Sequence, residues 1–253
     1  MDGTRRLALA AGSIGLAALV ALPTSALGQV GAGDGFLFGA PKGMFSVRMG
    51  VSQPFATGDP FTFFSDELTL SKSSYRAVDV AGDLAFTVAP RLDVVLGTGW
   101  SGSQAPSEER HWVDQDNQPI RQTTTLQRVP ITVSLKLYLR PRGTSVGRFA
   151  WVATSGLAPY VGAGGGLMFS RIHQWGNFVG TDTIIHSDNF ASESWTGTVR
   201  AFAGVDLPLG PRFVATAEAR YTYAKTPLGP DFKYFGDMDL SGVSLTVGAG
   251  VRF

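Results

Sequence analysis

The sequence of 253 residues has no cysteine and few charged residues, and after its first 28 residues it has no long apolar run. Without cysteine, disulfide bridges, thiolate metal sites, thiol nucleophiles and a cysteine lipid anchor are excluded. Charged residues make up 16% of the chain and the net charge is +1, so no global field favours nucleic acid or another polyanion. A membrane-spanning helix needs about 20 apolar residues, and no segment of the mature chain supplies them.

The N-terminus has the order of a secretory signal. Arg5 and Arg6 precede an apolar run over residues 7–22, and small residues lead to Gly28. This order predicts a signal peptide over residues 1–28, cleaved after Gly28. A transmembrane helix is the alternative, but the run is too short for one.

Most of the remaining chain alternates apolar and polar residues with a period of two, which indicates β-strands. Eight such runs cover residues 44–52, 76–88, 92–100, 129–139, 161–169, 195–205, 213–221 and 243–253. Each run is near the 9–11 residues that a tilted strand needs to cross a bilayer, and bacterial barrels have even strand numbers. We therefore predict an all-β protein: a short periplasmic segment over residues 29–42, then an eight-stranded antiparallel up-and-down transmembrane β-barrel over residues 43–253.

The connections differ in length from one end of the predicted barrel to the other. Short turns are expected at residues 89–91 and 207–210, where proline and glycine are present. Long polar loops are expected at residues 53–74, 103–122, 172–194 and 225–239. This pattern places both termini in the periplasm. Residues 140–155 are an exception, because this connection is long where a short turn is expected. Within it, Phe149–Val152 either extends the fifth strand or forms a small periplasmic element. Ten strands stay open if parts of the first or third long loop pair.

Alternation also fits a soluble lipocalin-like barrel or a sandwich, but the polar face carries charges in mid-strand. The apolar face has almost none, as a lipid-facing surface requires when a midplane Arg or Lys costs about 2–4 kcal/mol. We expect the charged face to fill the lumen as a paired network. Pairing the sixth and seventh strands about Leu209 would place Arg200 opposite Glu218. The network residues are Arg48, Asp79, Asp83, Asp93, Lys136, Arg200, Glu218 and Arg220.

Aromatic residues on the apolar face gather at the strand ends, which predicts interfacial girdles. Trp100, Phe169, Trp195, Tyr221 and Tyr223 are expected at the outer rim, and Phe45, Phe213 and Phe253 at the periplasmic rim.

Four segments resemble the small outer-membrane barrel families, such as the OmpA transmembrane domain, OmpX and OmpW. They are Tyr160–Gly166, Phe202–Phe213, Glu218–Tyr221 and Leu245–Phe253. The resemblance implies a barrel of the cell outer membrane, in contact with lipid and lipopolysaccharide. It also implies recognition by the barrel-assembly machinery through a C-terminal signal made of Val247, Ala249, Val251 and Phe253. We expect a monomer that binds no nucleic acid.

The sequence gives no support for catalysis or for a metal or cofactor site. His111, His173 and His186 have no metal-binding spacing. His186-Ser187-Asp188 invites comparison with barrel lipid A deacylases, but adjacent strand residues point to opposite faces. Gly162–Gly166 lacks the lysine and helix of a phosphate loop.

Three functions remain to be distinguished. The first is a non-enzymatic barrel with an envelope role, whose outer loops contact surfaces or ligands. The second is a narrow channel for small or hydrophobic solutes, and the third a lipid A-modifying enzyme; an exported soluble binder is a distant alternative. Loop aromatics motivate the first, although they could instead pack on one another: Phe61, Phe63, Phe64, Trp112, Trp175, Phe178, Phe232, Tyr234 and Phe235.

Overall fold

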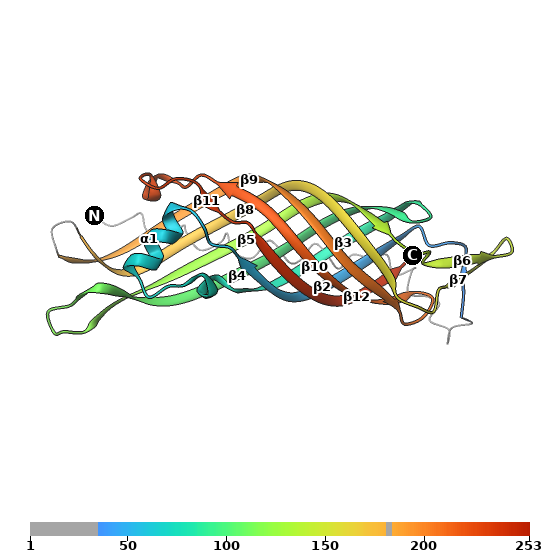
Figure 1. Ribbon diagram of the computed structural model, residues 1–253, viewed down its shortest axis with the longest axis horizontal. Helices are drawn as coiled ribbons and strands as arrows, with labels where there is room; N and C mark the ends of the chain where they lie inside the picture. Colours follow the sequence, from blue (N-terminus) through green and yellow to red (C-terminus); the bar gives the residue numbers. More distant parts are fainter. Residues whose placement is uncertain (1–34, 181–183) are drawn as a thin grey trace, which may run out of the picture. The chain divides into compact units, whose positions relative to one another are not determined.

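The computed structural model describes residues 35–180 and 184–253. The predicted signal peptide and the first part of the segment predicted over residues 29–42 lie outside the described residues. Eight antiparallel strands form one closed ring, because the last strand pairs with the first (Figure 1). In chain order they are β2 (Gly43–Pro54), β3 (Ala77–Ala89), β4 (Leu92–Val113), β5 (Pro119–Tyr138), β8 (Ala158–Val179), β9 (Ile185–Pro208), β10 (Phe213–Thr226) and β12 (Gly242–Arg252).

The ring has the predicted eight strands and not ten. A short strand, β11 (Met238–Asp239), pairs only with the end of β10. Every neighbouring pair in the ring is antiparallel, and each of the eight strands has a paired neighbour on both sides, so the ring has no open edge. A closed ring is the form in which strands can lie in hydrocarbon.

The two faces of the ring differ as the alternation predicts. On β12, Leu245 is 62% exposed, whereas the next residue, Thr246, is 4% exposed. Leu245 lies opposite Val51 of β2, which is 52% exposed. This outward apolar surface continues around the ring, and a surface of that extent is costly in water but suited to lipid. The predicted assignment of the faces is confirmed.

One end of the barrel is closed by the first and last long connections. They form helix α1 (Asp59–Glu67), the 3-10 turns η2 (Lys72–Tyr75) and η3 (Pro230–Phe232), and β11. In Figure 1, α1 lies at the end opposite the C-terminus. We call this end the loop end, and the end that holds Gly43 and Phe253 the terminal end. Among the described residues, no helix has the length and apolar character to cross a bilayer.

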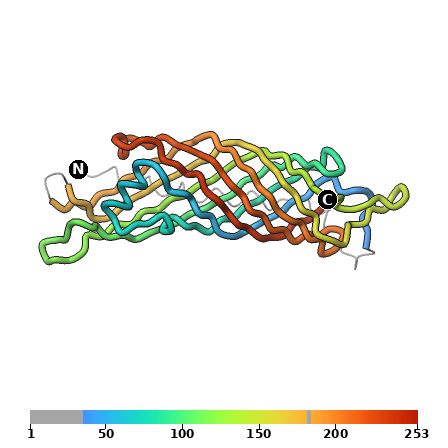
Figure 2. Tube along the Cα trace, viewed as in Figure 1, coloured from blue at the N-terminus to red at the C-terminus, as the bar shows by residue number. Residues whose placement is uncertain are grey.

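Four strands are much longer than a bilayer requires. β4, β5, β8 and β9 have 22, 20, 22 and 24 residues. The prediction of polar loops over residues 103–122 and 172–194 is therefore wrong, because most of these residues extend the strands as two β-hairpins. The hairpins reach further from the C-terminus than α1 does (Figure 2). Alternation does not reveal them, because beyond the membrane one face no longer has to be apolar.

The terminal end carries a second, small sheet. Its strands are β1 (Leu37–Phe38), β6 (Gly143–Val146) and β7 (Ala150–Ala153), in the order β1-β7-β6. The stretch Phe149–Val152 thus forms a small separate element and does not extend the fifth strand. Trp151 is buried in it and lies against the guanidinium of Arg252, 5.3 Å from the ring centre.

Candidate functional site in the barrel lumen

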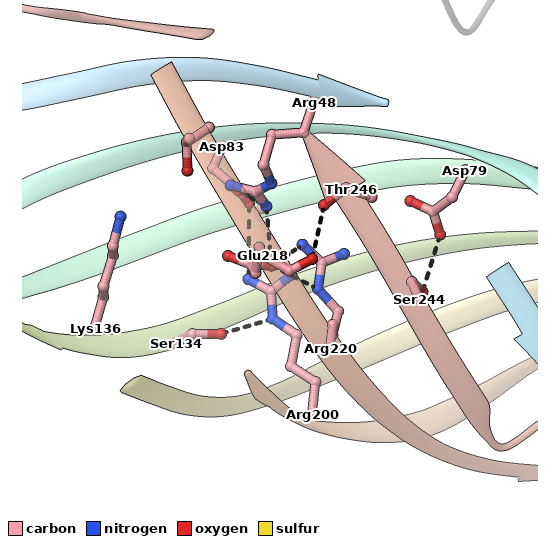
Figure 3. Close-up of polar contacts among 12 residues, drawn as sticks. Arg48, Asp79, Asp83, Ser134, Lys136, Arg200, Glu218, Arg220, Ser244 and Thr246 are labelled. Atoms are coloured by element: carbon pink, nitrogen blue, oxygen red, sulfur yellow. Dashed lines mark hydrogen bonds and ion pairs between the residues drawn. The ribbon is translucent and has the colours of Figure 1, made fainter. Parts of the chain in front are cut away.

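The centre of the lumen holds a compact group of charged side chains (Figure 3). Glu218 of β10 accepts hydrogen bonds from Arg220 (2.6 Å, Nη2 to Oε1) and Arg48 (3.3 Å, Nη2 to Oε1). Arg48 also pairs with Asp83 of β3. Arg200 donates to Ser134 Oγ at 2.8 Å and lies 3.8 Å from Asp83. The five charged residues of this group come from four strands, β2, β3, β9 and β10. Because β3 and β9 lie on opposite sides of the ring, the group ties opposite walls together.

The expected pairing of Arg200 with Glu218 is wrong. In the observed register, Glu218 lies opposite Gly204, and Arg200 lies opposite Thr222. Pro208 still pairs with Val214, so the turn centres nearer residue 211 than on Leu209. Both side chains still point into the lumen, because the observed register differs from the expected one by an even number of residues.

A second charged group lies nearer the terminal end. Asp206 accepts hydrogen bonds from Lys136 (3.1 Å) and from the Tyr138 hydroxyl (2.7 Å). The Lys136 ammonium also lies 3.6 Å from the ring centre of Tyr160. Tyr160 in turn donates to Glu218 at 3.1 Å, so the two groups form one continuous network.

Arg142 closes this network at the terminal end. It donates two hydrogen bonds to Asp93, at 2.8 and 2.9 Å, and one to Thr87. Arg142 belongs to residues 140–155, outside every alternating run, so no periodicity marks it as a lumen residue. Asp206 and Arg128 carry such a signal, because each continues the polar face of its strand.

Towards the loop end, the charged side chains that line the lumen have neutral hydrogen-bond partners. Arg128 donates to Ser52 Oγ at 2.7 Å and to the carbonyl of Leu240 at 3.1 Å. Asp79 accepts a hydrogen bond from Ser244 at 3.3 Å and is only half-buried. Of the eight residues proposed for the network, Asp79 is therefore the most peripheral.

Glycine at two inward positions makes room for this network. A Cβ added at Gly97 would collide with Asp83 and Arg200, and one added at Gly204 with the Tyr160 hydroxyl. The side chains leave a cavity of about 10 Å³ between them, lined by Arg48, Glu218 and their neighbours. That volume is about the space one water molecule needs, so this level of the lumen is filled by protein.

Above the charges, the loop end holds a hydrophobic cluster that we call the cap. Phe61 and Phe64 of α1 are 1% and 2% exposed and pack with Phe232 of η3, Leu240 and Ile172. Its other buried members are Ala56, Leu68, Leu70, Tyr75, Ala105, Leu126, Met168, Ala224 and Met238. Two layers of different chemistry, one apolar and one charged, thus close the barrel in succession.

The aromatic residues expected to form a binding surface divide between the cap and the exterior. Phe61, Phe64 and Phe232 are buried in the cap, so for these the alternative of mutual packing holds. Phe235 contacts Phe63 with ring centres 5.2 Å apart, Phe178 contacts Phe190 at 5.0 Å, and Trp175 stacks on His173 at 4.6 Å. The exposed members are Phe63, Trp112 and Tyr234.

Polar groups fix the cap to the ring. Asp239 accepts hydrogen bonds from the Thr57 hydroxyl (2.8 Å) and the Ser241 amide (2.9 Å). Burial alone would raise the pKa of Asp239, but these hydrogen bonds outweigh it and lower the pKa. Burial raises the pKa of the Tyr75 hydroxyl. At Glu109 on β4, burial and the nearby carboxylate of Glu67 raise the pKa.

The proposed girdle and assembly residues all lie on the outward face. Phe45, Val251 and Phe213 lie in one row across β2, β12 and β10 at the terminal end. Nearer the loop end, Phe169 and Trp195 are cross-strand neighbours with ring centres 5.4 Å apart. The exposed residues of the two sets are Trp100, Trp195, Phe213, Tyr221, Tyr223, Val247, Ala249, Val251 and Phe253.

The three residues compared with lipid A deacylases lie on one hairpin. His186, Ser187 and Asp188 lie in sequence on β9, opposite Phe178, Asn177 and Gly176, and all three are exposed on the hairpin. No group of three or more histidine or acidic side chains there is arranged to hold a metal ion.

No protein-family description and no curated protein matches this sequence. Among solved structures, the chain is similar to the outer membrane protein OprG from Pseudomonas aeruginosa, with 15% identity, a TM-score of 0.47 and coverage of 86% of this chain and 99% of that one. Neisserial surface protein A is similar with 12% identity, a TM-score of 0.43 and coverage of 83% and 96%. The N-terminal β-barrel domain of Pseudomonas aeruginosa OprF is similar with 14% identity, a TM-score of 0.35 and coverage of 85% of this chain and 100% of that one. The closed ring and its apolar exterior are those of an outer-membrane β-barrel.

Proposed function

We propose that this protein is a closed, non-enzymatic barrel of the outer membrane that presents its two long hairpins as a contact surface. The observation that carries the proposal is the double closure of the lumen. A solute entering at the loop end would meet the cap first and the charged network second. The side chains of the cap pack on one another, and the cavity within the charged network is about 10 Å³, which supports a closed lumen over a conducting one.

The two long hairpins supply a surface for contacts, which the filled lumen does not. β4–β5 and β8–β9 continue as a paired four-stranded wall, in which Gln122 of β5 lies opposite Gly176 of β8. Trp112 is 47% exposed near the tip of one hairpin. Rigid, amphipathic rings on a paired backbone are suited to protein or surface contacts.

Conductance in planar bilayers tests the closed lumen. We expect the purified, folded barrel to give no steady single-channel steps. Regular steps at the level of a narrow pore would contradict the proposal and favour the channel. Mass spectrometry of lipid A after expression tests the non-enzymatic part, and we expect the lipid to be unchanged.

We further propose that the loop end faces the exterior and the terminal end the periplasm, with insertion by the barrel-assembly machinery through β12. Because the sequence has no cysteine, single cysteines report position without background. A membrane-impermeant maleimide added to intact cells should label Trp112→Cys and spare Arg212→Cys. The opposite labelling would reverse the orientation.

A further inference from the structure

The net charge of +1 conceals a strong separation of charge between the two ends. The described connections at the loop end, within residues 53–76, 103–127, 170–196 and 225–241, carry twelve acidic and seven basic residues. At the terminal end, within residues 35–42, 87–93, 138–160, 206–213 and 252–253, seven residues are basic and two acidic. The basic residues there are Lys42, Arg91, Arg140, Arg142, Arg148, Arg212 and Arg252.

The two acidic residues at the terminal end do not balance the exposed cations. Asp93 and Asp206 are 0% and 1% exposed and are engaged by Arg142 and Lys136. Arg252 is buried against Trp151. Among the described residues of this end, the exposed charges are therefore all positive, and none of these five cations has an ion-pair partner: Lys42, Arg91, Arg140, Arg148 and Arg212.

Four of the cations lie around the ring. Lys42 precedes β2, Arg91 joins β3 to β4, Arg140 follows β5, and Arg212 joins β9 to β10. We call these four residues the basic rim. Since the strands that they flank are distributed around the closed ring, the four cations do not gather on one side of the barrel.

The basic rim lies close to the edge of the outward apolar surface. Arg140 directly follows Leu139, which is 52% exposed, and Arg212 directly precedes Phe213, which is 53% exposed. Lys42 and Arg91 are each three residues from an outward apolar side chain, Phe45 and Val88. Three strand residues span about 10 Å, which is similar to the depth of the headgroup region beside the hydrocarbon.

We propose that the basic rim binds the headgroups of anionic phospholipids in the leaflet at the terminal end. Long cationic side chains can place their stems on the apolar belt and their charges among phosphates. Cations spread around the ring fit an annulus of lipid, whereas an acidic protein partner would require them on one face. The inference rests on the membrane insertion of the barrel but not on the closed lumen, so channel conduction would leave it standing.

Native mass spectrometry of the folded, full-length mature barrel in detergent tests the proposal. The probes are phosphatidylglycerol and phosphatidylcholine with identical acyl chains, supplied in equal amounts. We expect a preference for phosphatidylglycerol of about fivefold for each headgroup that contacts the rim, weakening as salt is raised. In a variant with Lys42→Gln, Arg91→Gln, Arg140→Gln and Arg212→Gln, the preference should fall close to one.

A matched variant removes four exposed cations from the loop end: Lys72→Gln, Arg121→Gln, Lys225→Gln and Lys233→Gln. It should keep the preference of the unchanged protein. Both variants should show the same heat-induced gel shift as that protein, because every substituted side chain is exposed. The proposal is overturned if the unchanged barrel shows no preference, which would favour a protein partner, or if the loop-end variant loses the preference equally.

Discussion

Replacing Glu218 with alanine removes the carboxylate on which two arginines of the lumen converge. Its side chain is 3% exposed and accepts hydrogen bonds from Arg220 at 2.6 and 3.1 Å, from Arg48 at 3.3 Å and from Tyr160 at 3.1 Å. Without it Arg220 has no acidic partner among the described residues, whereas Arg48 keeps Asp83. Removing one partner of a buried ion pair costs about 3–5 kcal/mol, so we expect a loss in that range.

The measurement is urea unfolding of the barrel in lipid vesicles, with the free energy extrapolated to zero denaturant. Glu193→Ala is the matched control, because Glu193 pairs with Arg171 at a similar 3.3 Å but with side chains 54% and 45% exposed. An exposed pair contributes less than about 1 kcal/mol. If the two variants lost the same stability, the lumen charges would be as well solvated as those of the surface, and the closed-lumen reasoning would fail.

Three further predictions concern the cap and two acidic residues at the loop end. Phe64→Ala should destabilise the protein by about 3–5 kcal/mol and make residues 55–76 sensitive to protease in the folded barrel; full protease resistance would show that the cap does not depend on this ring. The pKa of Asp239 is lowered in the folded state, so the stabilisation by its carboxylate is complete above the unfolded pKa and is lost as the pH falls through the folded pKa. The protection factors of the β11 amides, which correct for the intrinsic exchange rate at each pH, should therefore fall below about pH 4, and Asp239→Asn should abolish that dependence. The pKa of Glu109 is raised in the folded state, so its carboxylate opposes folding at neutral pH. The protein should therefore gain stability as the pH falls towards the pKa of Glu109 in the unfolded chain, about 4.3. Unfolding measured at pH 7 and pH 5 should show this gain, and Glu109→Gln should remove it.

The sequence predicts the ring well because a strand in a bilayer has to alternate. Val51 and Leu245 face out and Arg48 faces in because of parity alone. The register between β9 and β10 depends on the turn, and the turn is not fixed by parity. That is why the alignment of Arg200 with Glu218 was wrong although both side chains do point inward.

The cap and the hairpins could not be predicted in the same way. Helix α1 has only nine residues, too few for a clear helical period, and it is held by contacts with η3 and β11 that are distant in sequence. Arg142 reaches Asp93 from a connection without alternation. Asp206 could have been found, since it continues the polar face beyond Gly204.

The lengths of β8 and β9 set how far beyond the bilayer these two strands extend. They have 22 and 24 residues, roughly 11 more than a crossing requires. At about 3.3 Å per residue and a tilt of about 40°, this surplus carries the two strands roughly 28 Å beyond the bilayer. A molecule in the surrounding medium could therefore touch the ends of β8 and β9 without approaching the lipid, and substitutions there would change the contact surface while leaving the spanning part of the barrel untouched.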